Sequence, residues 1–183
     1  MVTTVVIIAV IVIVIGFLIS LYNKLAKQKL VVNEAEADIE TFLKQRYDMI
    51  PNLVEIVKGY AKHESETFKM VTEMRSKAMS AGTLDEKMKF EKQLSAGITK
   101  IFAVAENYPE LKANENFKEL QTSLKGLEEN IQKSRRFYNG TVRDFNTVIA
   151  VFPNSLIAGI MGYKAMPFFE ATDEEKENVK IKF

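Results

Sequence analysis

The feature that most constrains this chain is an uncharged, apolar stretch at its beginning. Residues 1–23 contain no Asp, Glu, Lys or Arg, and every residue from 5 to 19 is apolar or glycine. A helix rises about 1.5 Å per residue, so about 20 residues cover the roughly 30 Å hydrocarbon core of a bilayer. Lipid offers no partner to backbone amides, so a crossing segment must be helical. We therefore expect residues 1–23 to be a transmembrane anchor that includes Val5, Ile8, Ile11, Ile15, Leu18 and Tyr22.

A cleaved signal peptide and a buried core helix are the alternatives for this stretch. A signal peptide opens with basic residues, has an apolar core of about 7–15 residues and ends in a small-residue cleavage site. None of these features is present in residues 1–23. The chain also contains no Cys, which excludes lipoprotein processing. We therefore expect the anchor to be retained.

The first charged residues after the stretch predict its orientation. Lys24, Lys27 and Lys29 follow directly, and no acidic residue precedes Glu34. Positive charge next to a transmembrane helix favours the cytoplasmic side, so we expect Met1 outside and the body of the protein in the cytoplasm. The three lysines are candidates for contact with lipid head groups, or they form an ordinary solvated helix face.

The remaining residues have the composition of a single helical domain. Only four Pro and eight Gly interrupt the chain, and the breaks at Pro51, Gly82, Pro109 and Pro153 leave four long helix-favouring segments. The 25 basic and 24 acidic residues nearly cancel, so no nucleic acid is expected as a partner. We divide the chain into the anchor (1–23), a helical bundle (24–153) and a C-terminal apolar segment with an extended tail (154–183).

Apolar residues seven apart predict helices with a continuous packing face. One series runs Leu18, Leu25, Val32 and Ile39, so the first helix is expected to leave the bilayer without a break. We expect Pro51 to begin a new helix rather than to kink a continuous one, because it lacks an N–H and clashes with the preceding turn. The predicted core consists of Leu25, Val32, Ile39, Phe42, Leu53, Val57, Phe117, Leu124, Ile131, Tyr138, Phe145 and Phe152.

These patterns predict an all-α fold, in which an N-terminal transmembrane helix is continuous with an antiparallel up-and-down four-helix bundle of long helices. Gly82 is expected to cap the second segment in the left-handed conformation, and Thr83 with Glu86 resembles a capping box for the third. Residues 156–163 are apolar but too few to cross a bilayer, so we expect them against the bundle or the membrane.

The end of the chain alternates apolar and basic residues. Val179, Ile181 and Phe183 are therefore candidates for contact with a partner, as an extended segment that adds to a sheet edge. A frayed tail is the alternative.

No motif in the chain predicts catalysis. His63 is the one histidine. A zincin requires a second His four residues later, but that position is Thr67. A di-iron site requires a Glu three residues before the His and a second such pair on another helix, and neither is present. No nucleophile elbow, Walker loop or dinucleotide-binding glycine motif occurs. We expect no catalytic, cofactor or metal site and no enzyme activity. Polar residues near the packing face either fix helix register or form a ligand site: Asn107, Asn114, Asn116, Gln121, Glu128, Arg135, Asn139 and Asn146.

Three stretches resemble a known family. They are residues 46–55 (RYDMIPNLVE), 106–114 (ENYPELKAN) and 168–171 (FFEA), and together with Tyr138-Asn139 they are similar to the LemA family of bacterial membrane proteins. Family members often have His and Leu where Tyr47 and Met49 stand. The resemblance implies an N-terminal anchor, a helical bundle, a cytoplasmic body at the bacterial inner membrane and no established catalytic residues.

The same resemblance suggests a role in membrane organisation. One branch of the family takes part in forming magnetosome membranes, and members are often encoded beside membrane metalloprotease or membrane-stress genes. Our leading hypothesis is a non-catalytic membrane scaffold that forms homo-oligomers at the lipid bilayer. The alternative is an adaptor that presents its C-terminal tail to a membrane protease or an envelope-stress system.

Overall fold

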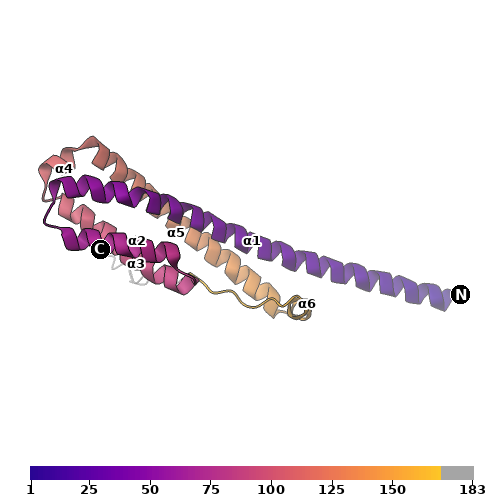
Figure 1. The fold of residues 1–183 in the computed structure, drawn as a ribbon. Coiled ribbons are helices and arrows are strands. Elements are labelled where there is room, and N and C mark those ends of the chain that lie inside the picture. Colours follow the sequence, from indigo (N-terminus) through magenta and orange to yellow (C-terminus); the bar gives the residue numbers. More distant parts are fainter. Residues whose placement is uncertain (170–183) are drawn as a thin grey trace, which may run out of the picture. The chain divides into compact units, whose positions relative to one another are not determined.

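The computed structural model describes residues 1–169, the side chain of Asp85 excepted, and within them the chain is helical and has no strand. Figure 1 shows the course of the chain. The predicted all-α class is thus confirmed for the described residues. The helices are α1 (Val2–Tyr60), α2 (Ser65–Ser80), α3 (Leu84–Ala105), α4 (Pro109–Ala113), α5 (Glu115–Ala150) and α6 (Asn154–Ile160).

The described residues form two compact units, and the two longest helices contribute to both. The first unit contains residues 1–38 and 134–168, and therefore the start of α1, the end of α5 and α6. The second unit contains residues 39–133 together with Phe169, and therefore the end of α1, all of α2 to α4 and the start of α5.

Helix α1 runs through Pro51, so the prediction that Pro51 begins a new helix was wrong. A proline within a helix leaves the carbonyl four residues earlier without its usual N–H donor. That carbonyl belongs to Tyr47, and it accepts a hydrogen bond of 2.7 Å from the Nε–H of Arg75 on α2. A side chain distant in the sequence therefore replaces the missing donor, which no local pattern could predict.

The first break in the helical chain lies at residues 61–64 instead. Ala61 still donates its N–H to the carbonyl of Val57 at 2.9 Å, after which the chain turns and α2 begins at Ser65. No Ala, Val, Ile, Leu, Met, Phe or Tyr occurs between Ala61 and Phe68, and this gap in the apolar series is the signal that sequence reasoning passed over.

Helices α2 and α3 form a hairpin of closely packed helices, which lie side by side in Figure 1. Thr83 caps α3 as predicted, because its Oγ1 accepts the N–H of Glu86 at 3.3 Å. Gly82 does not adopt the left-handed conformation expected of it, which in residues 1–169 occurs only at Gly162 (φ 71°). Gly97 allows the close packing, since a Cβ there would lie 2.6 Å from Cγ2 of Val71.

The expected core residues lie largely inside the protein. Ten of the twelve are buried, at most 3% exposed, whereas Phe42 is only partly buried. Phe152 is 79% exposed and is not part of the core. Helix α5 ends at Ala150, two residues before Phe152, because residues that precede a proline disfavour helical backbone, so the seven-residue spacing no longer places Phe152 on the packing face.

The packing face of α1 changes register near Phe42. Two consecutive steps of four residues, from Ala35 to Ile39 to Leu43, form a stutter, so Leu43 is buried where Phe42 was expected. Arg46, seven residues after Ile39, continues the other seven-residue series of the packing face and is only 2% exposed. The buried residues of α1 are Leu25, Val32, Ala35, Ile39, Leu43, Arg46, Tyr47, Ile50, Leu53 and Val57.

Candidate membrane-contact surface

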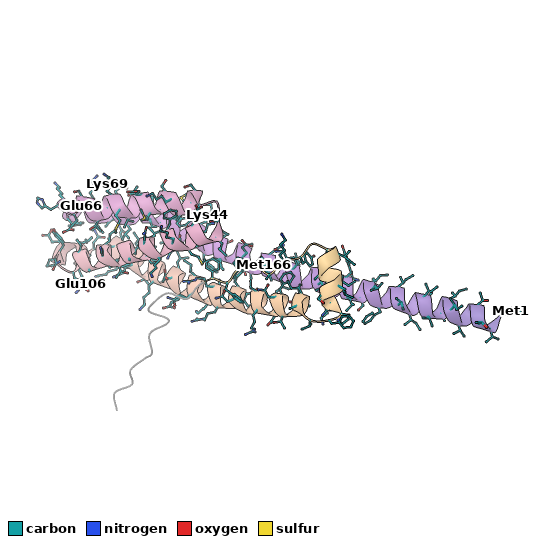
Figure 2. The ribbon with its side chains drawn as sticks, turned by 90° about the horizontal axis from the view of Figure 1, so that it is seen from below. Met1, Lys44, Glu66, Lys69, Glu106 and Met166 are labelled. Atoms are coloured by element: carbon teal, nitrogen blue, oxygen red, sulfur yellow. The ribbon has the colours of Figure 1, made fainter. Side chains whose placement is uncertain are left out.

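The N-terminal part of α1 presents apolar side chains to its surroundings on every side. Its most apolar 18-residue window has a mean hydropathy of 3.3 and no residue buried against the rest of the protein. Figure 2 shows side chains on both sides of this part of the helix, next to the labelled Met1. A helix that is apolar on all sides and lacks protein neighbours fits a lipid environment. The six expected anchor residues lie here, and each is 42–66% exposed.

The three lysines after the anchor have different surroundings. Lys24 and Lys27 are exposed, as contact with head groups requires. Lys29 is partly buried: its Nζ donates to the sulfur of Met166 at 3.0 Å and lies 5.9 Å from the centre of the Phe145 ring. Lys29 therefore packs within the first unit, and its contact with lipid head groups stays a prediction.

Helix α6 carries a second apolar surface. Its inner side buries Ala158, whereas Leu156 and Ile160 are 61% and 83% exposed, and Phe152 just before the helix is 79% exposed. These three exposed residues follow one another at intervals of four, so on a helix the last two share one face. We call Phe152, Leu156 and Ile160 the α6 ridge.

An apolar groove of about 650 Å³ joins α6 to the end of the anchor. From α1 it is lined by the last turns of the apolar stretch, and from α6 and the following residues by side chains that include a second tyrosine. The groove therefore lies at the level where the apolar stretch of α1 ends. Its lining residues are Leu18, Ile19, Tyr22, Ile157, Ile160, Met161 and Tyr163.

Residues 161–168, which we call the strap, hold α6 in place by returning along α5. The side-chain amide of Asn146 accepts the N–H of Met166 at 2.8 Å and donates to its carbonyl at 2.9 Å. Tyr138 donates its hydroxyl to the carbonyl of Pro167 at 3.2 Å. The rings of Tyr163 and Phe145 pack edge to face with centroids 5.6 Å apart. Asn146, predicted to fix helix register or form a ligand site, therefore fixes the strap.

Burial of Tyr138, aided by the negative charge of Glu36, raises the pKa of the Tyr138 hydroxyl. The hydroxyl consequently stays protonated, and able to donate to the strap, to a higher pH than an exposed tyrosine.

The second unit contains a buried polar cluster centred on Arg46. Its guanidinium forms ion pairs with Glu91 of α3 and, at 2.5 Å, with Glu128 of α5, and it donates to Ser95 Oγ at 3.1 Å. Tyr47 donates its hydroxyl to the same Glu91. Of these residues sequence reasoning singled out only Glu128 as a polar candidate; Arg46 lies seven residues after Ile39 in the predicted packing series, but a charged residue was not expected in an apolar core.

Burial raises the pKa of Tyr47 to about 12; the guanidinium of Arg46 acts against this shift and the carboxylate of Glu40 adds to it. Tyr47 is therefore a neutral hydrogen-bond donor at ordinary pH. The ion pairs of Arg46 with Glu91 and Glu128 join α1 to α3 and α5.

The other candidates from the sequence do not assemble into a site. His63 is exposed in the turn between α1 and α2. In the part of the chain that the structure describes, no group of three or more His, Asp or Glu side chains could hold a metal ion. Asn114 caps α5 by accepting the N–H of Phe117 at 3.1 Å, and Asn107 and Asn116 are exposed.

Three further polar candidates lie within or beside packed regions. Gln121 lines a groove beside Arg46, and Arg135 and Asn139 are partly buried and engaged in interactions. The candidate partner residues Val179, Ile181 and Phe183 lie outside the described residues.

Comparison with known proteins places the chain in a family. A family model described as the LemA family matches residues 35–183. Magnetosome protein MamQ of Magnetospirillum gryphiswaldense is 23% identical over 159 residues, covering 73% of this chain and 58% of its own length. Protein LemA of Metamycoplasma hominis is 25% identical over 161 residues, covering 86% of this chain and 72% of its own length.

A second MamQ protein, from Paramagnetospirillum magneticum, is 22% identical over 182 residues and covers 85% of this chain and 67% of its own length. The chain thus spans little more than half the length of the first of these relatives. The family model nevertheless matches residues 35–183, well over half of the chain. The chain therefore belongs to the LemA family.

Proposed function

We propose that this protein is a non-catalytic, single-pass membrane scaffold that self-associates at the bacterial inner membrane. The observation that carries the proposal is the unbroken course of α1. Its exposed apolar start and its buried packing face belong to one 59-residue helix, so the anchor passes directly into the helical body. Lys24 and Lys27, exposed just beyond the apolar stretch, favour an outside N-terminus and a cytoplasmic body.

The helical body is proposed to be an up-and-down four-helix bundle. Contacts within the second unit support this arrangement. Arg46 connects α1 to α3 and α5, Arg75 connects α2 to α1, and a short loop joins α2 to α3. Short connections between long helices favour antiparallel neighbours.

Self-association is supported by apolar side chains that remain exposed beyond the anchor. Leu30 and Phe137 in the first unit are each 56% exposed, and Val31 is 37% exposed. Leu30 lies eight residues past Tyr22, about 12 Å along α1, which is beyond the hydrocarbon core if the anchor ends there. Lipid tails would not cover these side chains, whereas a second copy of the chain could.

Two of the relatives are named magnetosome proteins, and this name supports a role in membrane organisation. A role of this kind needs an anchor, a body and contacts between copies, and no reacting group.

The test is the mass of the full-length protein in detergent, measured by sedimentation over a range of concentrations. We expect an oligomer, and we expect the Leu30→Glu/Phe137→Glu variant to shift it towards the monomer. Gln93→Glu introduces one such charge at an exposed position of another helix, α3, and should leave the mass unchanged. A monomer at every concentration would contradict self-association.

A further inference from the structure

The α6 ridge exposes three large apolar side chains on and beside a helix of only seven residues. Phe152, Leu156 and Ile160 are 61–83% exposed, although the buried Ala158 shows that the inner side of α6 packs against the protein. Large apolar side chains that cluster on a surface mark a site of contact with a membrane or a partner.

The position of α6 beside the end of the apolar stretch favours a membrane over a protein partner as the contact of the ridge. The groove beside α6 is lined by Leu18, Ile19 and Tyr22, the last turns of the apolar stretch of α1. If that stretch crosses the bilayer, α6 lies at the depth where hydrocarbon meets head groups. Tyr22 and Tyr163 both line the groove, and tyrosines are enriched at that boundary.

The charge pattern of this part of the chain agrees with lipid contact. No acidic residue occurs between Asp144 and Glu170, and Lys164 is the one charged residue in that interval. Exposed Lys24 and Lys27 follow the anchor in the same unit. An apolar face bordered by positive charge is the pattern of a helix that lies in the surface of an anionic bilayer.

The strap fixes this position. Asn146 holds the backbone of Met166 through two hydrogen bonds, and Tyr138 holds Pro167 through a third. The peptide after α6 is therefore tied to α5, and the ridge keeps its exposed position instead of folding back onto the protein.

From these observations we infer that α6 is an interfacial helix whose ridge inserts into the lipid at the membrane boundary and sets the depth of the protein. Lipid acyl chains then cover the ridge and fill the groove between α6 and α1. The inference rests on the anchor in the proposed function, and it adds a second lipid contact that the anchor alone does not require.

The test uses tryptophan as a depth reporter, because the chain contains none. Ile160→Trp and Phe152→Trp place single reporters on the ridge of the full-length protein, reconstituted in vesicles of phosphatidylcholine and phosphatidylglycerol. Phe17→Trp is the control within the anchor. Arg136→Trp is the water-exposed control, on α5 roughly 20 Å from its end at Ala150.

We expect both ridge reporters to emit at shorter wavelength than the Arg136→Trp control and to be quenched by brominated lipids, as the anchor reporter is. Emission and quenching equal to the Arg136→Trp control would overturn the inference. A third outcome is short-wavelength emission that brominated lipids do not quench and that shifts to longer wavelength when the protein is diluted with lipid. This result would show that a second copy of the chain covers the ridge, and it would also overturn the inference. An unquenched Phe17→Trp reporter would contradict the proposed anchor itself.

Discussion

Replacing Arg46 by methionine tests the buried polar cluster of the second unit. The guanidinium group joins three helices, because it lies on α1 and forms ion pairs with Glu91 of α3 and Glu128 of α5. Methionine has a similar length and fits an apolar packing face, so the change removes the charge and its hydrogen bonds while leaving little empty space.

The expected loss of folding free energy follows from how deeply Arg46 and its partners are buried. The side chain of Arg46 is 3% exposed and that of Glu91 is 12% exposed, so Arg46→Met leaves a carboxylate mostly out of water with no cation. Removing one partner of a buried pair costs about 3–5 kcal/mol of folding free energy. The lower part of that range is expected, because the side chain of Glu128 is 38% exposed and can turn to solvent.

The assay is unfolding by guanidinium chloride of the full-length protein in detergent, followed by circular dichroism and by hydrogen exchange of α3. Lys44→Met is the matched control: it removes the same charge from α1, but its 2.7 Å pair with Asp48 is exposed and contributes about 0.3–0.5 kcal/mol. The double variant Arg46→Met/Glu91→Met should recover most of the loss, because no charge stays buried. Equal effects of Arg46→Met and Lys44→Met would refute this reasoning.

Three further outcomes follow from the structure. Gly97→Ala should destabilise the protein by about 1–3 kcal/mol because its Cβ would lie 2.6 Å from a methyl group of Val71, whereas Gly126→Ala, with open space around it, should stabilise by about 0.5–1 kcal/mol in the same thermal melt. Asn146→Ala removes two hydrogen bonds to the strap, so limited proteolysis should cut the strap faster than in the original protein; an unchanged rate would refute its role. Burial raises the pKa of Tyr47 from 10.0 to about 12, so the folded state binds the hydroxyl proton more tightly than the unfolded state does. The stability that this proton contributes is complete below pH 10 and is lost as the pH rises towards 12. Melting temperatures of the Tyr47→Phe variant should therefore depend less on pH in this window than those of the original protein.

Much of the architecture could be predicted from patterns of residues close together in the sequence. The uncharged start of the chain predicted the apolar helix, the seven-residue series predicted most buried positions, and Thr83 with Glu86 predicted the start of α3. Each of these features depends on residues within a few turns of one another, which is the distance over which helix periodicity and capping act.

The misjudged positions depend on contacts distant in sequence. Pro51 stays within α1 because Arg75, 28 residues from Tyr47, supplies the missing donor. Leu43 replaces Phe42 on the packing face of α1 because the face changes register, and Phe152 lies off the packing face of α5 because that helix ends early. Periodicity projected from one helix cannot include such tertiary contacts, so the buried cluster and the strap required the structure.

The central claim is that the apolar start of α1 remains in the bilayer as part of the working protein. The most direct test is the intact mass of the chain recovered from membranes that have been washed with alkaline carbonate. We expect the washed membranes to retain a chain whose mass includes residues 1–23. Recovery in the wash, or a mass that lacks the first 20 or so residues of the anchor, would contradict the account.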